Sequence, residues 1–159
     1  MTPLARRGLL AVALAAVAIP SVAGDRPMDA RETEIRTTVE RYAQAWRAGD
    51  LAAIAGLYHE SFTLHYGGTH ALSGDHVGKA ASLATLAEFS RRTGRKLSGI
   101  VAVLSGPERG AIVARETFRK GEAVAELERV LVYAVRDGQF SECWVYDADP
   151  ALVAKFVGD

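Results

Sequence analysis

The stretch Val39–Gly74 reads VERYAQAWRAGDLAAIAGLYHESFTLHYGGTHALSG, and it carries most of the signals that decide the fold. Its first part places apolar side chains at helical spacing as far as Trp46, and Gly49 supplies a left-handed helix stop. Asp50 then caps a short second helix. The segment Phe62–Tyr66 predicts a strand, which a glycine pair ends. The stretch therefore predicts two helices and a strand in close succession, with aromatic and ionisable side chains crowded together.

The flanking sequence extends this pattern in both directions. Upstream, Asp29 followed by Glu32 predicts the start of the first helix. Downstream, a loop leads into a third helix from Gly78 to about Arg92. The period then changes to that of strands, which are expected at Leu97–Leu104, Ala111–Arg119, Ala123–Val135 and Gln139–Tyr146.

Two short motifs complete the reading of the chain. Asp137-Gly138 lies between the last two apolar runs and is a strong hairpin signal. Asp149-Pro150 opens a short terminal helix. The resulting order α-α-β-α-β-β-β-β-α has successive antiparallel strands and helices gathered at one face, so the sequence predicts an α+β fold.

Composition narrows the class of protein. The chain has 159 residues, which favours a single domain. Lys and Arg together number 19, as do Asp and Glu, so no basic field is present that would attract nucleic acid. The single cysteine, Cys143, cannot form an internal disulfide and is interpreted as a buried thiol in an apolar strand.

The N-terminus has the pattern of an export signal. Arg6-Arg7 precede an apolar run over 8–19, which is too short to span a bilayer, and small residues follow at Ser21–Ala23. We therefore expect residues 1–23 to be a signal peptide, 24–33 a linker and 34–159 the folded domain. The protein is expected to be exported, periplasmic or secreted, by the general or the twin-arginine route. No membrane association is expected after cleavage.

The element order, taken with a set of short motifs, resembles the nuclear transport factor 2-like superfamily, and its SnoaL-like branch in particular. These motifs are Arg41-Tyr42, Trp46, Gly49-Asp50-Leu51, Leu57-Tyr58, Ser73-Gly74, Gly78, Asp137-Gly138-Gln139-Phe140 and Glu142-Cys143-Trp144. The resemblance covers nearly the whole expected domain. It implies a cone-shaped, curved antiparallel sheet packed on three helices, a nuclear transport factor 2-like or cystatin-like fold, with a mostly apolar pocket inside. It also implies a homodimer formed through the sheet.

The resemblance implies a set of candidate site residues. Tyr42 matches the position where ketosteroid isomerases place a tyrosine that donates to the developing enolate oxygen, a role suited to a neutral hydroxyl in a dry site. Its alternative interpretation is an ordinary inward-facing core tyrosine. The expected ligand-binding side chains around it are the aromatic residues Trp46, Tyr58, Trp144 and Tyr146.

The isomerase also needs a carboxylate on the first strand, and this chain departs from that pattern. The matching position is Tyr66 when counted from Tyr58, and His65 when counted from Gly74, and one residue changes the face of a strand. His65 would serve as a general base, with Tyr66 as the alternate. The second acid position falls near Arg129, which cannot act as a neutral carboxylic acid. Ketosteroid isomerisation is therefore not predicted.

Other acidic side chains remain as candidates. Some polyketide cyclases of the superfamily use an acid–base aspartate from the last strand, and Asp147 is the nearest match here. Glu128 shares one face of its strand with apolar residues, which suits either a pocket acid of raised pKa or a solvated carboxylate. Glu126, two residues earlier on the same face, is interpreted as solvated.

The four histidines at 59, 65, 70 and 76 suggest a metal site, but their spacing fits neither a helical pair nor a close strand pair. No metal and no cofactor are expected. Two functions therefore stay open. One is an exported, cofactor-free enzyme of the isomerase, cyclase or hydratase kind that acts on a small hydrophobic molecule. The other is a non-catalytic module that binds such a molecule or serves as an accessory dimerisation unit.

Overall fold

The computed structural model describes residues 29–158, and the statements below concern those residues. The predicted signal peptide 1–23 lies outside them, as do residues 24–28 of the predicted linker. The first helix begins at Ala30, so it includes the last part of the segment 24–33 that we expected to be a linker.

Ten elements follow one another along the described chain. They are α1 (Ala30–Ala48), α2 (Leu51–Gly56), β1 (Tyr58–Tyr66), β2 (Gly74–Val77), α3 (Lys79–Thr93), β3 (Lys96–Ser105), β4 (Gly110–Lys120), β5 (Ala123–Arg136), β6 (Gln139–Asp147) and α4 (Pro150–Val157).

The strands form one six-stranded sheet in the order β2-β1-β6-β5-β4-β3. Four of the neighbouring pairs are antiparallel. The exception is the pairing of β1 with β6, which is parallel. The α+β class with a curved sheet is confirmed, and the sheet is mixed where we expected it to be antiparallel throughout.

Two strand boundaries also differ from the prediction. β1 begins at Tyr58 instead of Phe62, because Tyr58, two residues after the short helix α2, already pairs with Phe140 of β6. β2, over Gly74–Val77, was expected to be part of a loop. It is a short, mostly exposed edge strand whose sequence lacks the apolar alternation by which strands are recognised.

Local chemistry explains where the helices start and stop. The side chain of Asp29 accepts a hydrogen bond from the backbone N–H of Glu32 at 2.7 Å, and Gly49 ends α1 with a φ of 67°. Between β5 and β6, Asp137 and Gly138 both have positive φ, at 52° and 69°. Positive φ at both central residues is the geometry of a type I′ hairpin turn, as the Asp-Gly pair predicted.

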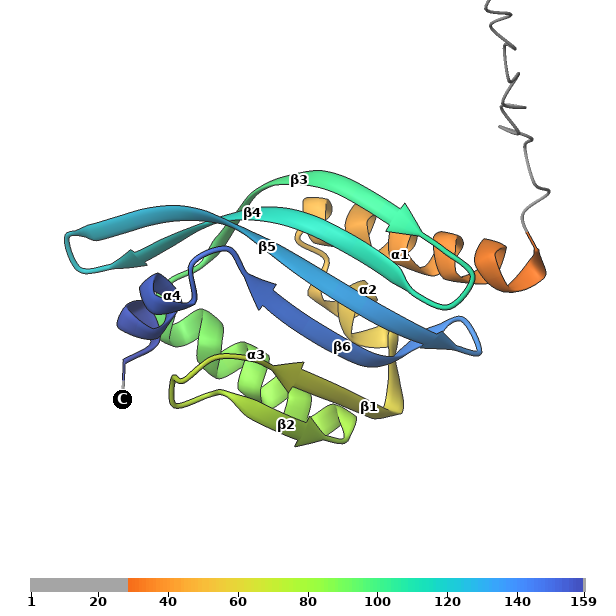
Figure 1. Cartoon of the computed structure of the whole chain (residues 1–159), viewed down its shortest axis with the longest axis horizontal. Helices are drawn as coiled ribbons and strands as arrows, with labels where there is room; N and C mark the ends of the chain where they lie inside the picture. The colour runs from red at the N-terminus through yellow and green to blue at the C-terminus, as the bar shows by residue number, and fades with distance from the viewer. Residues whose placement is uncertain (1–28, 159) are drawn as a thin grey trace, which may run out of the picture.

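The helices lie together on one face of the sheet (Figure 1). α1 packs on β3, β4 and β5, while α3 packs on β1, β2 and β4. Their apolar faces and the inner face of the sheet form the core, whose fully buried members include Ile35, Val39, Phe89, Phe118 and Phe140. Among the described residues, no helix combines the length and the apolar character needed to cross a membrane.

Candidate functional site

A hollow of about 480 Å³ lies between α1, α2, β1 and α3. We call it the interior hollow. Its apolar walls come from Trp46, Leu51, Ile54, Ala55, Leu83, Leu86 and Ala87. Its polar lining comes from Tyr42, Tyr58, Ser90 and Arg95. A second depression of about 510 Å³ lies outside, between α1 and α2, and none of the predicted site residues lines it.

Tyr42 and Tyr58 both line the interior hollow, and their hydroxyl groups contact each other. The two oxygens are 2.8 Å apart, and the Tyr42 ring meets the edge of Trp46 at 5.7 Å between centroids. Burial raises the pKa of both hydroxyls above the ordinary tyrosine value, so both stay neutral at physiological pH. In such a pair one hydroxyl donates to the other, and the accepting hydroxyl keeps its own O–H for a further acceptor.

His65 does not line the interior hollow, because it lies on the opposite face of β1 from the buried Leu64 and Tyr66. Its Nδ1 is 2.8 Å from Asp75 Oδ1 and its Nε2 is 3.0 Å from Glu142 Oε2. Its burial lowers the pKa of the imidazole, but the hydrogen bonds to Asp75 and Glu142 outweigh that effect, and the net pKa lies above its ordinary value. Of the two positions left open on the first strand, Tyr66 is buried and His65 lies on the other face of β1.

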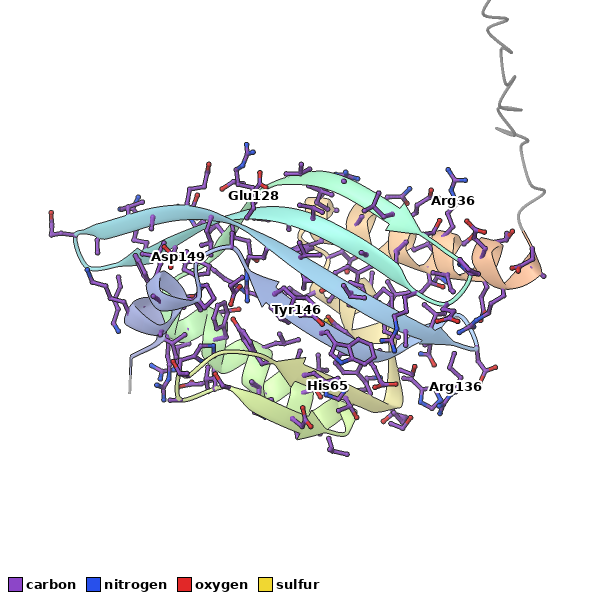
Figure 2. All side chains as sticks on the ribbon, viewed as in Figure 1. Arg36, His65, Glu128, Arg136, Tyr146 and Asp149 are labelled. Atoms are coloured by element: carbon purple, nitrogen blue, oxygen red, sulfur yellow. The ribbon has the colours of Figure 1, made fainter. Side chains whose placement is uncertain are left out.

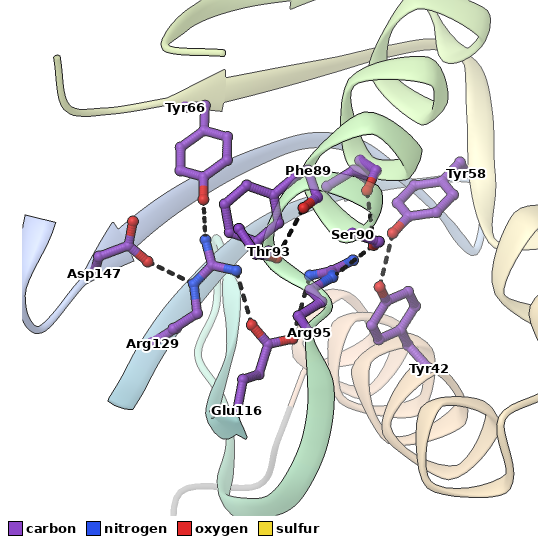
Figure 3. Close-up of polar contacts among 11 residues, drawn as sticks. Tyr42, Tyr58, Tyr66, Phe89, Ser90, Thr93, Arg95, Glu116, Arg129 and Asp147 are labelled. Carbon is purple, nitrogen blue, oxygen red and sulfur yellow. Dashed lines mark hydrogen bonds and ion pairs between the residues drawn. The ribbon is translucent and has the colours of Figure 1, made fainter. Parts of the chain in front are cut away.

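Tyr66 points inward, and with Asp147 it contacts the guanidinium of Arg129 (Figure 3). Arg129 Nη1 also donates to Glu116 Oε2 at 2.8 Å. The side chains of Arg129 and Glu116 are each 1% exposed and that of Asp147 is 4% exposed. Asp147 is thus engaged in a buried ion pair and does not line the interior hollow, contrary to its expected role as an acid–base group there.

Arg95 connects this buried ionic cluster to the interior hollow. Its Nη1 donates to Glu116 Oε1 at 3.2 Å, and its Nε donates to Ser90 Oγ at 2.8 Å. Arg95 follows directly on the stop of α3 at Gly94, so its sequence context indicates an ordinary surface cation near a helix end. Sequence reasoning missed Arg95, and it also missed the contribution of Leu83 and Leu86 of α3 to the lining.

The remaining predicted site residues lie on the outer face of the sheet, away from α1 and α3. Figure 2 labels His65, Glu128 and Tyr146 there. Glu128 accepts a hydrogen bond from Arg115 Nη2 at 2.7 Å, and Tyr146 is 57% exposed. The Trp144 ring stacks on His65 at 4.8 Å between centroids. Trp144 and Tyr146 therefore do not contribute to the interior hollow, and Glu128 is a surface carboxylate.

The histidines make separate hydrogen bonds to other parts of the chain. Within residues 29–158, no three His, Cys, Asp or Glu side chains are arranged so that they could hold a metal ion. His76 contacts Thr85 Oγ1 at 3.0 Å and Leu72 O at 3.0 Å, while His59 contacts its neighbour Ser61. Cys143 is buried as predicted, and burial raises the pKa of its thiol to about 12.

The fold and this site define a class of protein: an α+β cone with an aromatic-lined hollow beside its first helix. The SnoaL-like domain matches residues 39–143 of the sequence. The chain belongs to the SnoaL-like domain family. No curated protein sequence matches the chain.

Solved structures show the same fold at low sequence identity. Bal32a, from a soil-derived mobile gene cassette, is 22% identical with a TM-score of 0.72, over 80% of this chain and 99% of its own. A Xanthomonas campestris protein of unknown function with a cystatin-like fold is 20% identical with a TM-score of 0.71, over 77% and 97%. A nuclear transport factor 2-like protein from Burkholderia xenovorans is 22% identical with a TM-score of 0.66, over 82% and 99%. These likenesses establish the superfamily fold.

Proposed function

We propose that this protein binds a small, mostly apolar molecule in the interior hollow. The observation that carries the proposal is the void of about 480 Å³ beside Tyr42 and Trp46, walled by leucine, isoleucine, alanine and tryptophan side chains. Ligand sites of this kind are apolar concavities of several hundred Å³ with few polar groups. The Tyr42–Tyr58 pair supplies such a group, since its remaining O–H can donate to an oxygen of the ligand.

Binding without chemistry fits the lining better than acid–base catalysis does. Of the described residues that line the hollow, none is a carboxylate or a histidine. The groups expected to move a proton, His65 and Asp147, are each engaged by other side chains outside it. Catalysis remains a second candidate because the neutral Tyr42–Tyr58 pair resembles a donor for a developing oxyanion.

Export and dimerisation complete the proposed picture. The signal-like sequence of residues 1–23 supports a periplasmic or secreted location. Exposed apolar side chains on the sheet support a homodimer: Val101 and Leu104 of β3, Val124 of β5 and Tyr146 of β6. Sedimentation equilibrium of the mature chain tests the dimer. N-terminal sequencing of the protein recovered from its host tests cleavage after Ala23.

The binding proposal is tested by closing the hollow from its edge. Ala87 is an exposed residue of α3 that also lines the hollow, whereas Ala84, one turn earlier, is exposed and does not line it. Native mass spectrometry of protein purified from its own host should show a retained small molecule in the unsubstituted protein and in Ala84→Trp. Ala87→Trp should lose it. Equal retention of the small molecule by both variants would count against the proposal. So would an unsubstituted protein that carries no small molecule and whose thermal stability is raised by no apolar probe.

A further inference from the structure

The charge balance around Arg95 indicates what kind of apolar molecule the interior hollow takes. Arg129 donates to both carboxylates of the buried cluster, Glu116 and Asp147. Arg95 contacts only one of these carboxylates, Glu116, at the longer distance of 3.2 Å. Two cations and two carboxylates balance over the whole cluster, but both carboxylates contact Arg129. Arg95 is therefore the less fully compensated of the two cations.

That charge faces the hollow. Arg95 is the only charged residue among the described residues that line it, and its side chain is 19% exposed. Its Nε and Nη1 are used by Ser90 and Glu116, while Nη2 makes no hydrogen bond to any residue in the range 29–158. A guanidinium nitrogen that has no protein partner and lies beside apolar walls can donate a charge-assisted hydrogen bond to a matching acceptor, and such bonds are stronger than those between neutral groups.

The tyrosine pair lies within electrostatic reach of the same guanidinium. Burial raises the pKa of Tyr42 and Tyr58, and the positive charge of Arg95 acts in the opposite direction on each hydroxyl. Figure 3 shows the Arg95 head group between Glu116 and the Tyr42–Tyr58 pair. One acidic group on a ligand could thus receive a charged donor from Arg95 and a neutral donor from the tyrosine pair.

Resting on the proposed binding function, we propose that the ligand is an apolar carboxylic acid whose carboxylate is held by Arg95 and whose hydrocarbon part fills the space between Trp46 and Leu86. A monoanion suits a single, partly compensated cation, and a planar carboxylate matches the fork of a guanidinium. A phosphate dianion would require more positive charge than this wall provides.

Matched ligand pairs provide the test. Calorimetric titration of the full mature chain uses 4-phenylbutyrate, 2-naphthoate and decanoate, each beside its primary amide, which keeps the shape and removes the charge. The best-fitting acid should bind at least tenfold more tightly than its amide. Arg95→Gln should reduce that ratio to near one, Arg95→Lys should keep part of it, and Arg136→Gln, an exposed arginine at the end of β5, should leave it unchanged.

The outcomes separate the two proposals. If the unsubstituted protein binds the acid and its amide with equal affinity, and Ala87→Trp abolishes the binding of both, the carboxylate assignment is overturned. The proposal of apolar binding would then still hold. An acid preference that survives in folded Arg95→Gln would also overturn it. Failure of every probe to bind would remove both proposals. If Arg95→Gln does not fold, the acid-to-amide ratio in the unsubstituted protein and in Arg95→Lys decides the matter.

Discussion

Glu116 and Arg129 form an ion pair on the inner face of β4 and β5, with Nη1 and Oε2 2.8 Å apart and each side chain 1% exposed. One residue away on each strand, Arg115 and Glu128 form a pair at 2.7 Å on the outer face, with the charges exchanged between the strands. Those two side chains are 47% and 45% exposed. The same two strands therefore carry one buried and one solvated pair, which makes them a matched comparison.

Removing the buried cation should be far more damaging than removing the exposed one. Arg129→Met leaves Glu116 and Asp147 buried with little or no compensation, so the free energy of unfolding should fall by roughly 3–5 kcal/mol. Arg115→Gln should cost only a small fraction of that, because water screens the outer pair. Urea denaturation of both variants measures the difference. Similar losses for the two variants would show that the inner pair is as well hydrated as the outer one.

The Tyr42–Tyr58 hydrogen bond should appear as a coupling energy. Tyr42→Phe leaves the Tyr58 hydroxyl buried without its partner and should lower the free energy of unfolding by about 1 kcal/mol or more. Tyr58→Phe should act similarly. The double variant should lose less than the sum of the two, because it leaves neither hydroxyl unpaired. Strict additivity in a double-mutant cycle would mean that the two hydroxyls do not interact in solution.

His65 should make stability depend on pH. Its folded pKa lies above the ordinary value of 6.5, because the hydrogen bonds to Asp75 and Glu142 outweigh its desolvation. The stabilisation is therefore fully present below pH 6.5 and is lost as the pH rises through the folded pKa. Urea denaturation should show His65→Gln less stable than the unsubstituted protein near neutral to mildly acidic pH, with the gap closing toward alkaline pH.

A matched control removes the acceptors and leaves the histidine. Asp75→Asn combined with Glu142→Gln should remove most of the pH dependence that His65 contributes. In a proton NMR titration, the midpoint of the His65 imidazole signals should lie above pH 6.5 in the unsubstituted protein. In the double variant the midpoint should move back toward 6.5. A midpoint at or below 6.5 in the unsubstituted protein would contradict the bridging arrangement.

Gly94 should tolerate substitution much less well than Gly121. Both have positive φ, at 55° and 59°. A Cβ on Gly94 would lie 2.4 Å from the carbonyl oxygen of Arg119, whereas a Cβ on Gly121 would meet no atom within 4 Å. Gly121→Ala should cost about 1 kcal/mol from the left-handed backbone alone, and Gly94→Ala should cost roughly 2 kcal/mol or more, because the chain must also shift. Thermal denaturation of the two variants separates the effects.

Much of the fold follows from local signals in the sequence. Asp29 and Gly49 mark the ends of α1, and Asp137-Gly138 marks the β5–β6 hairpin, because each works through a backbone or side-chain interaction with close neighbours. The parallel pairing of β1 with β6 could not be read in this way. It joins strands far apart in the chain, and no local motif specifies it.

The same distinction between local and long-range signals applies to the residues of the candidate site. Tyr42, Trp46 and Tyr58 were predicted because they fall within one aromatic-rich stretch, and all three line the interior hollow. Arg95 and Arg129 were not predicted as site residues. Arg95 lies between α3 and β3, and its contact with Glu116 joins segments far apart in the chain. Arg129 meets Glu116 only through the register of β5 on β4, which no local motif specifies. A one-residue shift reverses the face of a side chain, so single-sequence reasoning could not decide it.

The order of the strands has a consequence for synthesis on the ribosome. β6, over Gln139–Asp147, is the last strand to be translated, yet it occupies an interior place in the sheet, between β1 and β5. Until it emerges from the exit tunnel, the early β1–β2 hairpin and the later β3–β4–β5 meander have no strand to join them. The nascent domain therefore completes its sheet only after β6 has emerged, and a chain truncated before Gln139 would present two unjoined strand edges to chaperones and proteases.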